Sequence, residues 1–384
     1  MNAQRVLTII LICLLFSGVA YAQLADDVIT ITDFSDRVVD PDGENEDWQP
    51  AFQAAIAEAR ETQQPIYLPV GEYRIQQAIT IEPVEVEGTP FVRNYIYMFG
   101  ADRFKTKISQ QAEGQNCINW TGPDAKNSAV HGHLANMTIA GGEIGLNIKY
   151  HNRFHLENCY IVGASEYGIY TEGYSSRFED CVVRWCSNIG FYAGGHFNDN
   201  MIRDFYFQRN AIGIKFNGVH GSRVESCAFE RNAKAAIIMS GIRNLTLCNS
   251  YFEGNGYANV DILPVEGVPH TVMLDRLCRA VSIHDNIFRK NIDDRGALLA
   301  IADLRHGHIY DNYFYNYNPG GRAVMLYGES ELDPERPTVI SDLVFEHNAH
   351  ENFDIPFSET EPGLLEAAVE KDSSFDWPLA EPEE

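Results

Sequence analysis

Three copies of one short pattern decide the fold: Phe154-His-Leu-Glu-Asn-Cys-Tyr-Ile161, Arg177-Phe-Glu-Asp-Cys-Val-Val183 and Ile202-Arg-Asp-Phe-Tyr-Phe207. A run that starts with Gly and an apolar residue follows each copy, and these runs are Gly168-Ile-Tyr-Thr, Gly190-Phe-Tyr-Ala and Gly213-Ile-Lys-Phe. The pattern recurs on both sides, and its last apolar residues are Ile139, Ile161, Val183, Phe207, Phe229, Phe252, Phe288 and Phe314. Their spacings are 22, 22, 24, 22, 23, 36 and 26 residues. A repeat period near 22 residues is typical of a solenoid.

The residue types within each repeat select the kind of solenoid. Each period holds short runs that alternate apolar and polar residues, are rich in Ile, Val, Phe and Tyr, and are separated by Gly, Asn and Ser. Because no helix-length stretch lies between these runs, helical repeats are excluded. We predict an all-β, right-handed parallel β-helix with three short strands per coil. Stacked coils would place Asn286 beside Asn312 and Cys159 beside Cys181, with Cys227 two coils further on, as corner ladders.

The first 22 residues have the pattern of a secretory signal peptide. Arg5 is their single positive charge, an apolar run extends from Val6 to Phe16, and Ala20-Tyr-Ala22 precedes Gln23. The protein is therefore predicted to be secreted or periplasmic. After the signal peptide, no run of about 20 apolar residues predicts a membrane span.

The remaining sequence divides into a β-helix domain and a tail. The domain is predicted over residues 23–355, with the N-terminal cap and first strands at 28–75 and coils to about residue 350. An acidic tail is predicted over residues 356–384. Seven of the eight cysteines follow residue 22, mostly at corner positions of the repeat, and we predict buried free thiols rather than a disulfide framework.

The net charge restricts the partners. The formal net charge is -25 at pH 7, which makes nucleic acid a poor partner. A polyanionic sugar would also be repelled, unless basic residues gather where it binds or a cation such as calcium bridges it. The sequence does not indicate the oligomeric state or whether calcium is needed.

Four segments near the N-terminus carry a family resemblance. They are Val28-Ile-Thr-Ile-Thr-Asp-Phe34, Asp40-Pro-Asp-Gly-Glu-Asn-Glu-Asp47, Trp48-Gln-Pro-Ala-Phe-Gln-Ala-Ala-Ile-Ala-Glu-Ala59 and Pro65-Ile-Tyr-Leu-Pro-Val-Gly-Glu-Tyr-Arg-Ile75. This order of strand, Asp/Gly-rich loop, helix and strand resembles the opening of the pectate-lyase-like superfamily, with Ser35 in place of the family's glycine. Asp47 can cap the helix, which we expect over 47–62, and its apolar stripe would cover the open end of the first coil.

The resemblance implies a protein that acts on polysaccharide by hydrolysis, β-elimination or epimerisation. The motif set of polygalacturonases is absent, because Asp293-Asp294 stands alone and residues 131–133 and 306–308 read His-Gly-His, whereas the family has Gly-His-Gly. The Asp-Pro-His-Glu signature of mannuronan epimerases is also absent. The motifs therefore leave the activity open.

The alternation of the Gly-apolar strands predicts one functional face. With Ile169, Phe191, Ile214 and Val260 inward, the outward residues on neighbouring coils about 5 Å apart are Tyr170, Glu172, Tyr192, Lys215, Asn217 and Asp261. Turns just after these strands are predicted to hold His and Arg residues, namely His151, Arg153, Arg177, His196, His220, Arg223 and Arg243. The two longest insertions, Leu263 to Arg279 and Gly328 to Thr338, are placed after the same strand, and we therefore place the site on this face.

The predicted site has catalytic and substrate-binding candidates but no metal ligands. The catalytic candidates are Lys215, His196, Tyr192, Arg223, Glu172 and Asp261, and the substrate-binding candidates are Tyr170, Arg177, His220 and Asn217. These candidates also have structural interpretations. Tyr170 and Tyr192 can form an exposed aromatic stack, Lys215 can be a solvated lysine, and the two histidines can cap turns. Glu157, Glu179 and Glu225 are interpreted as a structural charge ladder that Arg203 interrupts. The His-Gly-His sequences are interpreted as turns, because no third ligand has a matching spacing.

Three functions remain open from the sequence. A polysaccharide lyase that acts on an anionic, uronate-containing substrate needs a cation for the carboxylate, a base for the adjacent proton and an acid for the leaving oxygen. The basic and tyrosine candidates offer these three roles. A glycoside hydrolase needs two carboxylates, for which Glu172, Asp199 and Asp261 are available. A non-catalytic carbohydrate-binding or surface scaffold is the third, since fold alone does not fix activity.

Overall fold

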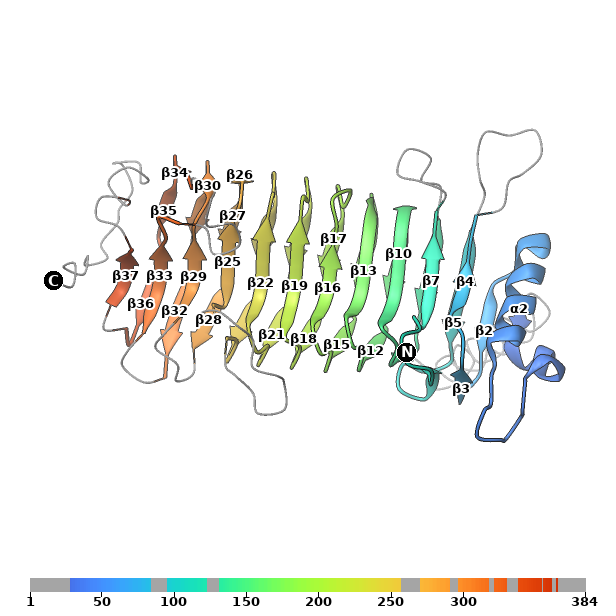
Figure 1. The fold of residues 1–384 in the computed structure, drawn as a ribbon. Helices are drawn as coiled ribbons and strands as arrows, with labels where there is room; N and C mark the ends of the chain where they lie inside the picture. The colour runs from blue at the N-terminus through green and yellow to red at the C-terminus, as the bar shows by residue number, and fades with distance from the viewer. Residues whose placement is uncertain are drawn as a thin grey trace, which may run out of the picture.

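Three long parallel sheets form the molecule, and each coil of the chain adds one strand to each sheet (Figure 1). The computed structural model describes residues 28–83, 95–122, 131–256, 270–290, 296–317, 321–329, 338–353, 355–360 and 364. The predicted signal peptide and nearly all of the predicted tail lie outside these residues. Coils stack into a rod with the helix α2 (Gln49–Thr62) at one end and the strand β37 at the other.

We name the sheets A, B and C, and the chain visits them in the repeating order B, A, C. Sheet A contains β1 (Ile29–Thr30), β2 (Ile66–Leu68), β5 (Ile96–Gly100), β8 (Gly132–Ala135), β11 (His155–Glu157), β14 (Arg177–Glu179), β17 (Met201–Arg203), β20 (Arg223–Glu225), β23 (Thr246–Cys248), β27 (Ser282–His284), β31 (His308–Tyr310) and β35 (Val344–Glu346). Sheet B contains β4 (Ile79–Ile81), β7 (Ile118–Thr121), β10 (Ile144–Asn152), β13 (Tyr167–Tyr174), β16 (Ile189–Ala193), β19 (Ile212–Asn217), β22 (Ala235–Ser240), β25 (Val272–Asp275), β29 (Ala297–Ile301), β33 (Arg322–Leu326) and β37 (Ile355–Glu359).

Sheet C contains β3 (Gly71–Ile75), β6 (Thr106–Gln110), β9 (Thr138–Ala140), β12 (Tyr160–Val162), β15 (Val182–Arg184), β18 (Tyr206–Gln208), β21 (Ala228–Glu230), β24 (Tyr251–Glu253), β28 (Ile287–Lys290), β32 (Tyr313–Asn316) and β36 (Ala349–Glu351). A small fourth sheet contains β26 (Cys278–Arg279), β30 (Leu304–Arg305) and β34 (Ile340–Ser341). The prediction of an all-β parallel β-helix with three strands per coil is confirmed.

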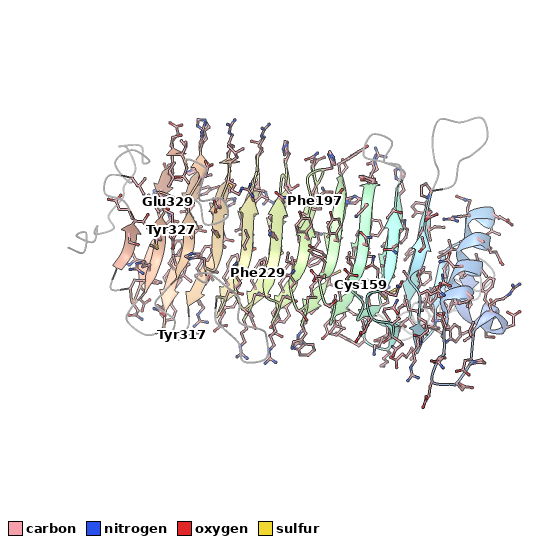
Figure 2. All side chains as sticks on the ribbon, viewed as in Figure 1. Cys159, Phe197, Phe229, Tyr317, Tyr327 and Glu329 are labelled. Atoms are coloured by element: carbon pink, nitrogen blue, oxygen red, sulfur yellow. The ribbon has the colours of Figure 1, made fainter. Side chains whose placement is uncertain are left out.

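The repeating apolar residues form continuous stacks inside the rod. Phe229 lies between Phe207 and Phe252, with ring centroids 5.0 and 4.8 Å away and nearly parallel planes. The stack continues to Phe288 and Phe314. These five side chains are fully buried, and Phe229 is labelled in Figure 2. Each coil repeats the same backbone path. The last apolar residue of the pattern in one coil therefore packs against the corresponding residue of the next coil.

Corner ladders hold the turns together, as the repeat predicted. The backbone N–H of Asn286 donates to Oδ1 of Asn312 at 3.1 Å. The N–H of Cys159 donates to Sγ of Cys181 at 3.3 Å. All seven cysteines of the described residues are free and buried, which confirms the predicted thiols.

Glycine at the start of the sheet B strands allows the coils to approach closely. A Cβ at Gly168 would lie 2.6 Å from the carbonyl oxygen of Gly190, and one at Gly190 would lie 2.8 Å from that of Gly213. Both distances are below normal contact, so a side chain would push the coils apart. The Gly-apolar signature of the repeat is explained by this contact.

The N-terminal cap differs from the prediction in detail. α2 begins at Gln49, and Oδ1 of Asp47 accepts its N–H at 3.0 Å. Phe52 and Ile56 are buried against the end of the rod. The prediction of a strand over residues 28–34 is wrong beyond Thr30. β1 is the edge strand of sheet A, and a 3₁₀ helix, Ile31–Arg37, follows it. Among the residues that the structure describes, none forms a helix with the length and apolarity that crossing a membrane requires.

One strand of sheet B was assigned to the wrong residues. Ile237 of β22 pairs with Val272 of β25, so β25 occupies the position that was predicted for Val260 and Asp261. β25 has no glycine and all four of its residues are buried, so it lacks the alternation that marks the earlier strands. Residues 260 and 261 lie outside the described residues. The insertion predicted from Leu263 to Arg279 contains the sheet B strand β25, so it does not simply follow a sheet B strand.

His151 was predicted in a turn after a sheet B strand, but it lies within β10 and is fully buried. Its Nδ1 lies 2.7 Å from Ser176 Oγ and its Nε2 lies 2.7 Å from Thr171 Oγ1. Ser176 donates its own hydrogen to the carbonyl of Tyr174, so it accepts from Nδ1–H, and Thr171 then donates to Nε2. The neutral imidazole is fully satisfied, and burial lowers the pKa of His151 to about 3.

We expect this histidine to make the fold sensitive to acid. An unfolded histidine takes up a proton below about pH 6.5, whereas folded His151 does so only near pH 3. Stability is therefore lost as the pH falls through this window, by about 2 kcal/mol between pH 7 and pH 5. Urea unfolding of the wild type and His151→Gln at both pH values measures it. The variant is expected to lose about 2 kcal/mol less on acidification, and equal losses would contradict the assignment.

Candidate functional site

The predicted face exists on the outside of sheet B. Tyr170, Tyr192 and Lys215 pair in register on the consecutive strands β13, β16 and β19. We define the tyrosine–lysine face as Lys149, Tyr170, Glu172, Tyr192, Lys215 and Asn217, which point outward from β10, β13, β16 and β19 and are partly or fully exposed. Inward Ile169, Phe191 and Ile214 are buried, so the predicted alternation is confirmed on these strands.

Contacts between neighbours fix the side chains of this face. The rings of Tyr170 and Tyr192 are stacked with centroids 5.0 Å apart, and Lys149 Nζ lies 4.7 Å from the centroid of Tyr170. The hydroxyl of Tyr170 donates to Glu172 Oε1 at 2.6 Å, and burial together with this bond raises the pKa of Tyr170. Asn217 Nδ2 donates to the hydroxyl of Tyr192 at 3.2 Å. The proton of Tyr170 is therefore engaged, whereas Tyr192 accepts a bond and keeps its own proton to donate.

The surroundings of Lys215 lower its pKa. It is half-buried, and burial lowers the pKa of its amine. The charges of Lys234 and Arg276 lower this pKa further. Three cationic groups thus lie near one another on a chain of net charge -25. A lysine whose pKa is lowered in this way is suited to accept a proton, and its neighbours are suited to bind an anion.

The polar face ends where the outward column becomes apolar. After Lys215 the same column continues with Ile238, Met273 and Ala300, which are 2%, 5% and 1% exposed. Asp275 and Asp303 lie further along the rod and are also buried. Asp303 Oδ2 accepts the backbone N–H of Leu277, a turn residue with positive φ. This carboxylate therefore stabilises a turn.

Several predicted site residues lie elsewhere. Arg177 and Arg223 are not in turns, because they start β14 and β20 on the outside of sheet A. Arg223 is bound by Glu225, with Nε and Oε2 2.9 Å apart. His196 and His220 lie where they were predicted: His196 is exposed in the turn after β16, and His220 is exposed just after β19, in the corner column between sheets B and A. Asp261 lies outside the described residues.

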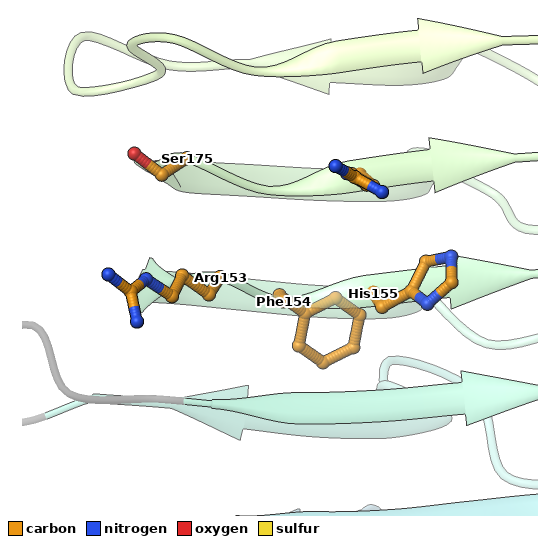
Figure 3. A pocket seen from close by; sticks show the side chains of 5 residues that line it. Arg153, Phe154, His155 and Ser175 are labelled. Atoms are coloured by element: carbon orange, nitrogen blue, oxygen red, sulfur yellow. The ribbon is translucent and has the colours of Figure 1, made fainter.

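A pocket of about 340 Å³ opens at the corner that leads into sheet A. Its lining residues are Arg153, Phe154, His155, Ser175 and Arg177. Figure 3 shows Arg153 and Ser175 at one end of neighbouring strands, with His155 further along β11. Two arginines at one pocket on an acidic chain favour an anionic group there.

A histidine and glutamate cluster beside this pocket was missed by the sequence analysis. It contains His133 of β8, His155 and Glu157 of β11, and Glu179 of β14 on the outside of sheet A. Oε2 of Glu157 lies 3.4 Å from His133 Nε2 and 3.9 Å from His155 Nε2. Burial and the charge of His155 lower the pKa of His133, while Glu157 opposes this shift. The interpretation of 131–133 as a turn is wrong for His133, because it lies in β8, and the 22-residue register places it beside His155.

Residues 144–291 match the family described as "Right handed beta helix region". Similar solved structures include a thermostable GH87 alpha-1,3-glucanase from Streptomyces thermodiastaticus, with a TM-score of 0.61, 13% identity, and coverage of 92% of this chain and 69% of that one. A DFA-IIIase from Arthrobacter chlorophenolicus without its lid has a TM-score of 0.53, 12% identity, and coverage of 85% and 98%.

The pre-mature gene product 12 of bacteriophage phi29 is also similar, with a TM-score of 0.51 and 10% identity. This chain covers 54% of that structure, which covers 90% of this one. No curated protein matches this chain in sequence. At these identities the comparisons establish the fold, and the chain is a right-handed parallel β-helix, as its repeats predicted.

Proposed function

We propose that this protein is a carbohydrate-active enzyme that cleaves a uronate-containing polysaccharide by β-elimination on the tyrosine–lysine face. The fold is shared with structures named as a glucanase and a DFA-IIIase, which supports activity on a glycan. One observation carries the finer proposal: Lys215, with its lowered pKa, lies beside Lys234, Arg276 and a tyrosine pair on a strongly acidic chain.

The residues of the face match the steps of the reaction. Lys149, Lys234 and Arg276 neutralise the uronate carboxylate, and the neutral amine of Lys215 takes the proton from the adjacent carbon. The electron pair of that C–H bond forms a C=C bond as the glycosidic C–O bond breaks. The leaving oxygen then receives the hydroxyl proton of Tyr192, which Asn217 holds in place. The exposed His196 in the following turn is the alternative proton donor or acceptor.

Calcium is not needed for this sequence of steps. Ca²⁺ takes about six to eight oxygen ligands, and among the outward residues of β10, β13, β16 and β19 Glu172 is the one carboxylate. The cationic side chains therefore neutralise the substrate in place of a metal. The same count disfavours a glycoside hydrolase on this face, because that reaction needs two carboxylates.

The proposal is tested on a panel of uronate and neutral polysaccharides, with and without EDTA. The absorbance of unsaturated uronates and the reducing ends are followed in parallel. We expect both signals to rise on a uronate substrate, and EDTA to leave them unchanged. Reducing ends alone would support the glycoside hydrolase, and no signal on any substrate would support a binding or scaffold protein.

A matched pair of variants separates the two tyrosines. Tyr192→Phe removes the proposed acid and should lower turnover about 100-fold. Tyr170→Phe removes a hydroxyl that is already engaged with Glu172 and should lower turnover much less. Equal losses in the two variants would show that the tyrosines act as a binding platform rather than as an acid.

A further inference from the structure

The histidine and glutamate cluster on sheet A lies on a different sheet from the tyrosine–lysine face and is independent of it. The parallel register aligns His133 with His155, and Glu157 with Glu179, on the neighbouring strands β8, β11 and β14. The ring of His133 stacks on Tyr97 and on His155, with centroid distances of 4.4 Å in both cases. This stacking holds both imidazoles in one orientation, so their Nε2 atoms face Glu157.

The two Nε2 atoms lack the partners that buried nitrogens usually have. Neither makes a hydrogen bond, although both are shielded from solvent. Glu157 Oε2 lies 3.4 and 3.9 Å away, which is ion-pair distance without hydrogen-bond geometry. A buried polar atom without a hydrogen bond costs free energy, and a metal ion would satisfy both lone pairs at once.

The spacing of the donor atoms fits a small tetrahedral ion. Bonds of about 2.0 to 2.2 Å place two ligands of a tetrahedral zinc site about 3.4 Å apart. The measured separations are 3.4 Å for His133 Nε2 and Glu157 Oε2, 3.9 Å for His155 Nε2 and Glu157 Oε2, and 3.4 Å for His155 Nε2 and Glu179 Oε2. The nitrogen and oxygen donors of the three-residue group all lie within 4.8 Å of one another. Small side-chain movements would complete the coordination.

We propose that His133, His155 and Glu157 bind a Zn²⁺ ion, with Glu179 as the fourth ligand. Arg203 Nη2 lies 3.1 Å from Glu179 Oε1, which orients this carboxylate and leaves Oε2 directed at His155. Two imidazoles favour zinc over calcium, which prefers oxygen ligands. The site is therefore distinct from any calcium bridge to a substrate.

Isothermal titration of the chelator-treated, full-length mature protein with Zn²⁺ tests the site. We expect about one ion per chain, and no competition from excess Ca²⁺. His133→Gln and His155→Gln should each weaken Zn²⁺ binding at least about tenfold. Co²⁺ should give the visible absorption of a tetrahedral site in the wild type and lose it in these variants.

The chain offers a matched control for this experiment. His308 lies in the same outward column of sheet A, and its Nε2 is 3.3 Å from Glu346 Oε2. His308→Gln should leave Zn²⁺ affinity unchanged, and circular dichroism without metal verifies that each variant is folded. Lys215→Ala should also bind Zn²⁺ normally, so this proposal and the proposed reaction fail independently. Absence of stoichiometric Zn²⁺ binding in the wild type, or an equal loss in His308→Gln, would overturn the proposal.

Discussion

Turnover of a uronate polysaccharide is expected to fall about 10²- to 10⁴-fold in Lys215→Ala, the usual scale for loss of a general base. Burial and the charges of Lys234 and Arg276 lower the pKa of Lys215, so a larger share of its amine is neutral and able to accept a proton. The same shift predicts that wild-type turnover rises with pH through this lowered pKa. Steady-state rates across the pH range measure both effects.

Lys215→Arg tests whether Lys215 acts as a base or only as a positive charge that neutralises the substrate. A guanidinium stays protonated at any working pH, so it keeps the positive charge but cannot accept a proton. We expect Lys215→Arg to be nearly as inactive as Lys215→Ala. Lys107→Ala is the control, because Lys107 lies on sheet C and pairs with Glu72. Near-wild-type turnover in Lys215→Arg would show that the residue only neutralises the substrate.

We expect Phe229→Ala to cause a large loss of stability. Phe229 is fully buried and its ring stacks on Phe207 and Phe252, so truncation leaves a cavity between two coils. Phe-to-Ala substitutions of this kind cost about 3 to 5 kcal/mol. We expect the free energy of unfolding in urea, followed by circular dichroism, to fall by about this amount.

Phe104→Ala is the matched control for the stack. Phe104 is 64% exposed and contacts Tyr160 edge-on. Its removal should cost less than about 1 kcal/mol, as surface substitutions usually do. A cost of that small size in Phe229→Ala would mean that the coils do not pack through this column.

The fold could be predicted from the sequence because a solenoid repeats its contacts. One residue of each coil meets its counterpart in the next, so the spacing of Phe229 and Phe252 already indicates a stack. The same logic placed Asn286 against Asn312 correctly. It failed for the strand predicted at residues 260 and 261, because all four residues of β25 are buried and the strand lacks the glycine and the apolar–polar alternation of the earlier repeats.

The site was harder to predict because the chemistry of a side chain depends on its contacts as well as on the face of the sheet from which it points. Alternation placed Lys215 and Tyr192 on one face, but the burial that lowers the pKa of Lys215 has no signal in the strand itself. Arg223 was placed at this site, whereas Glu225 binds it on sheet A. The repeat offered a signal for the missed cluster, because His133 and His155 are one 22-residue coil apart.

The incorporation of solvent oxygen tests the proposed reaction most directly. The wild-type protein is incubated with a uronate polysaccharide in water enriched in heavy oxygen, and the masses of the products are measured by mass spectrometry. Elimination forms a C=C bond without adding water, so we predict unsaturated products that carry no heavy oxygen from cleavage. Saturated products with one heavy oxygen per cleaved bond would contradict the account and establish hydrolysis.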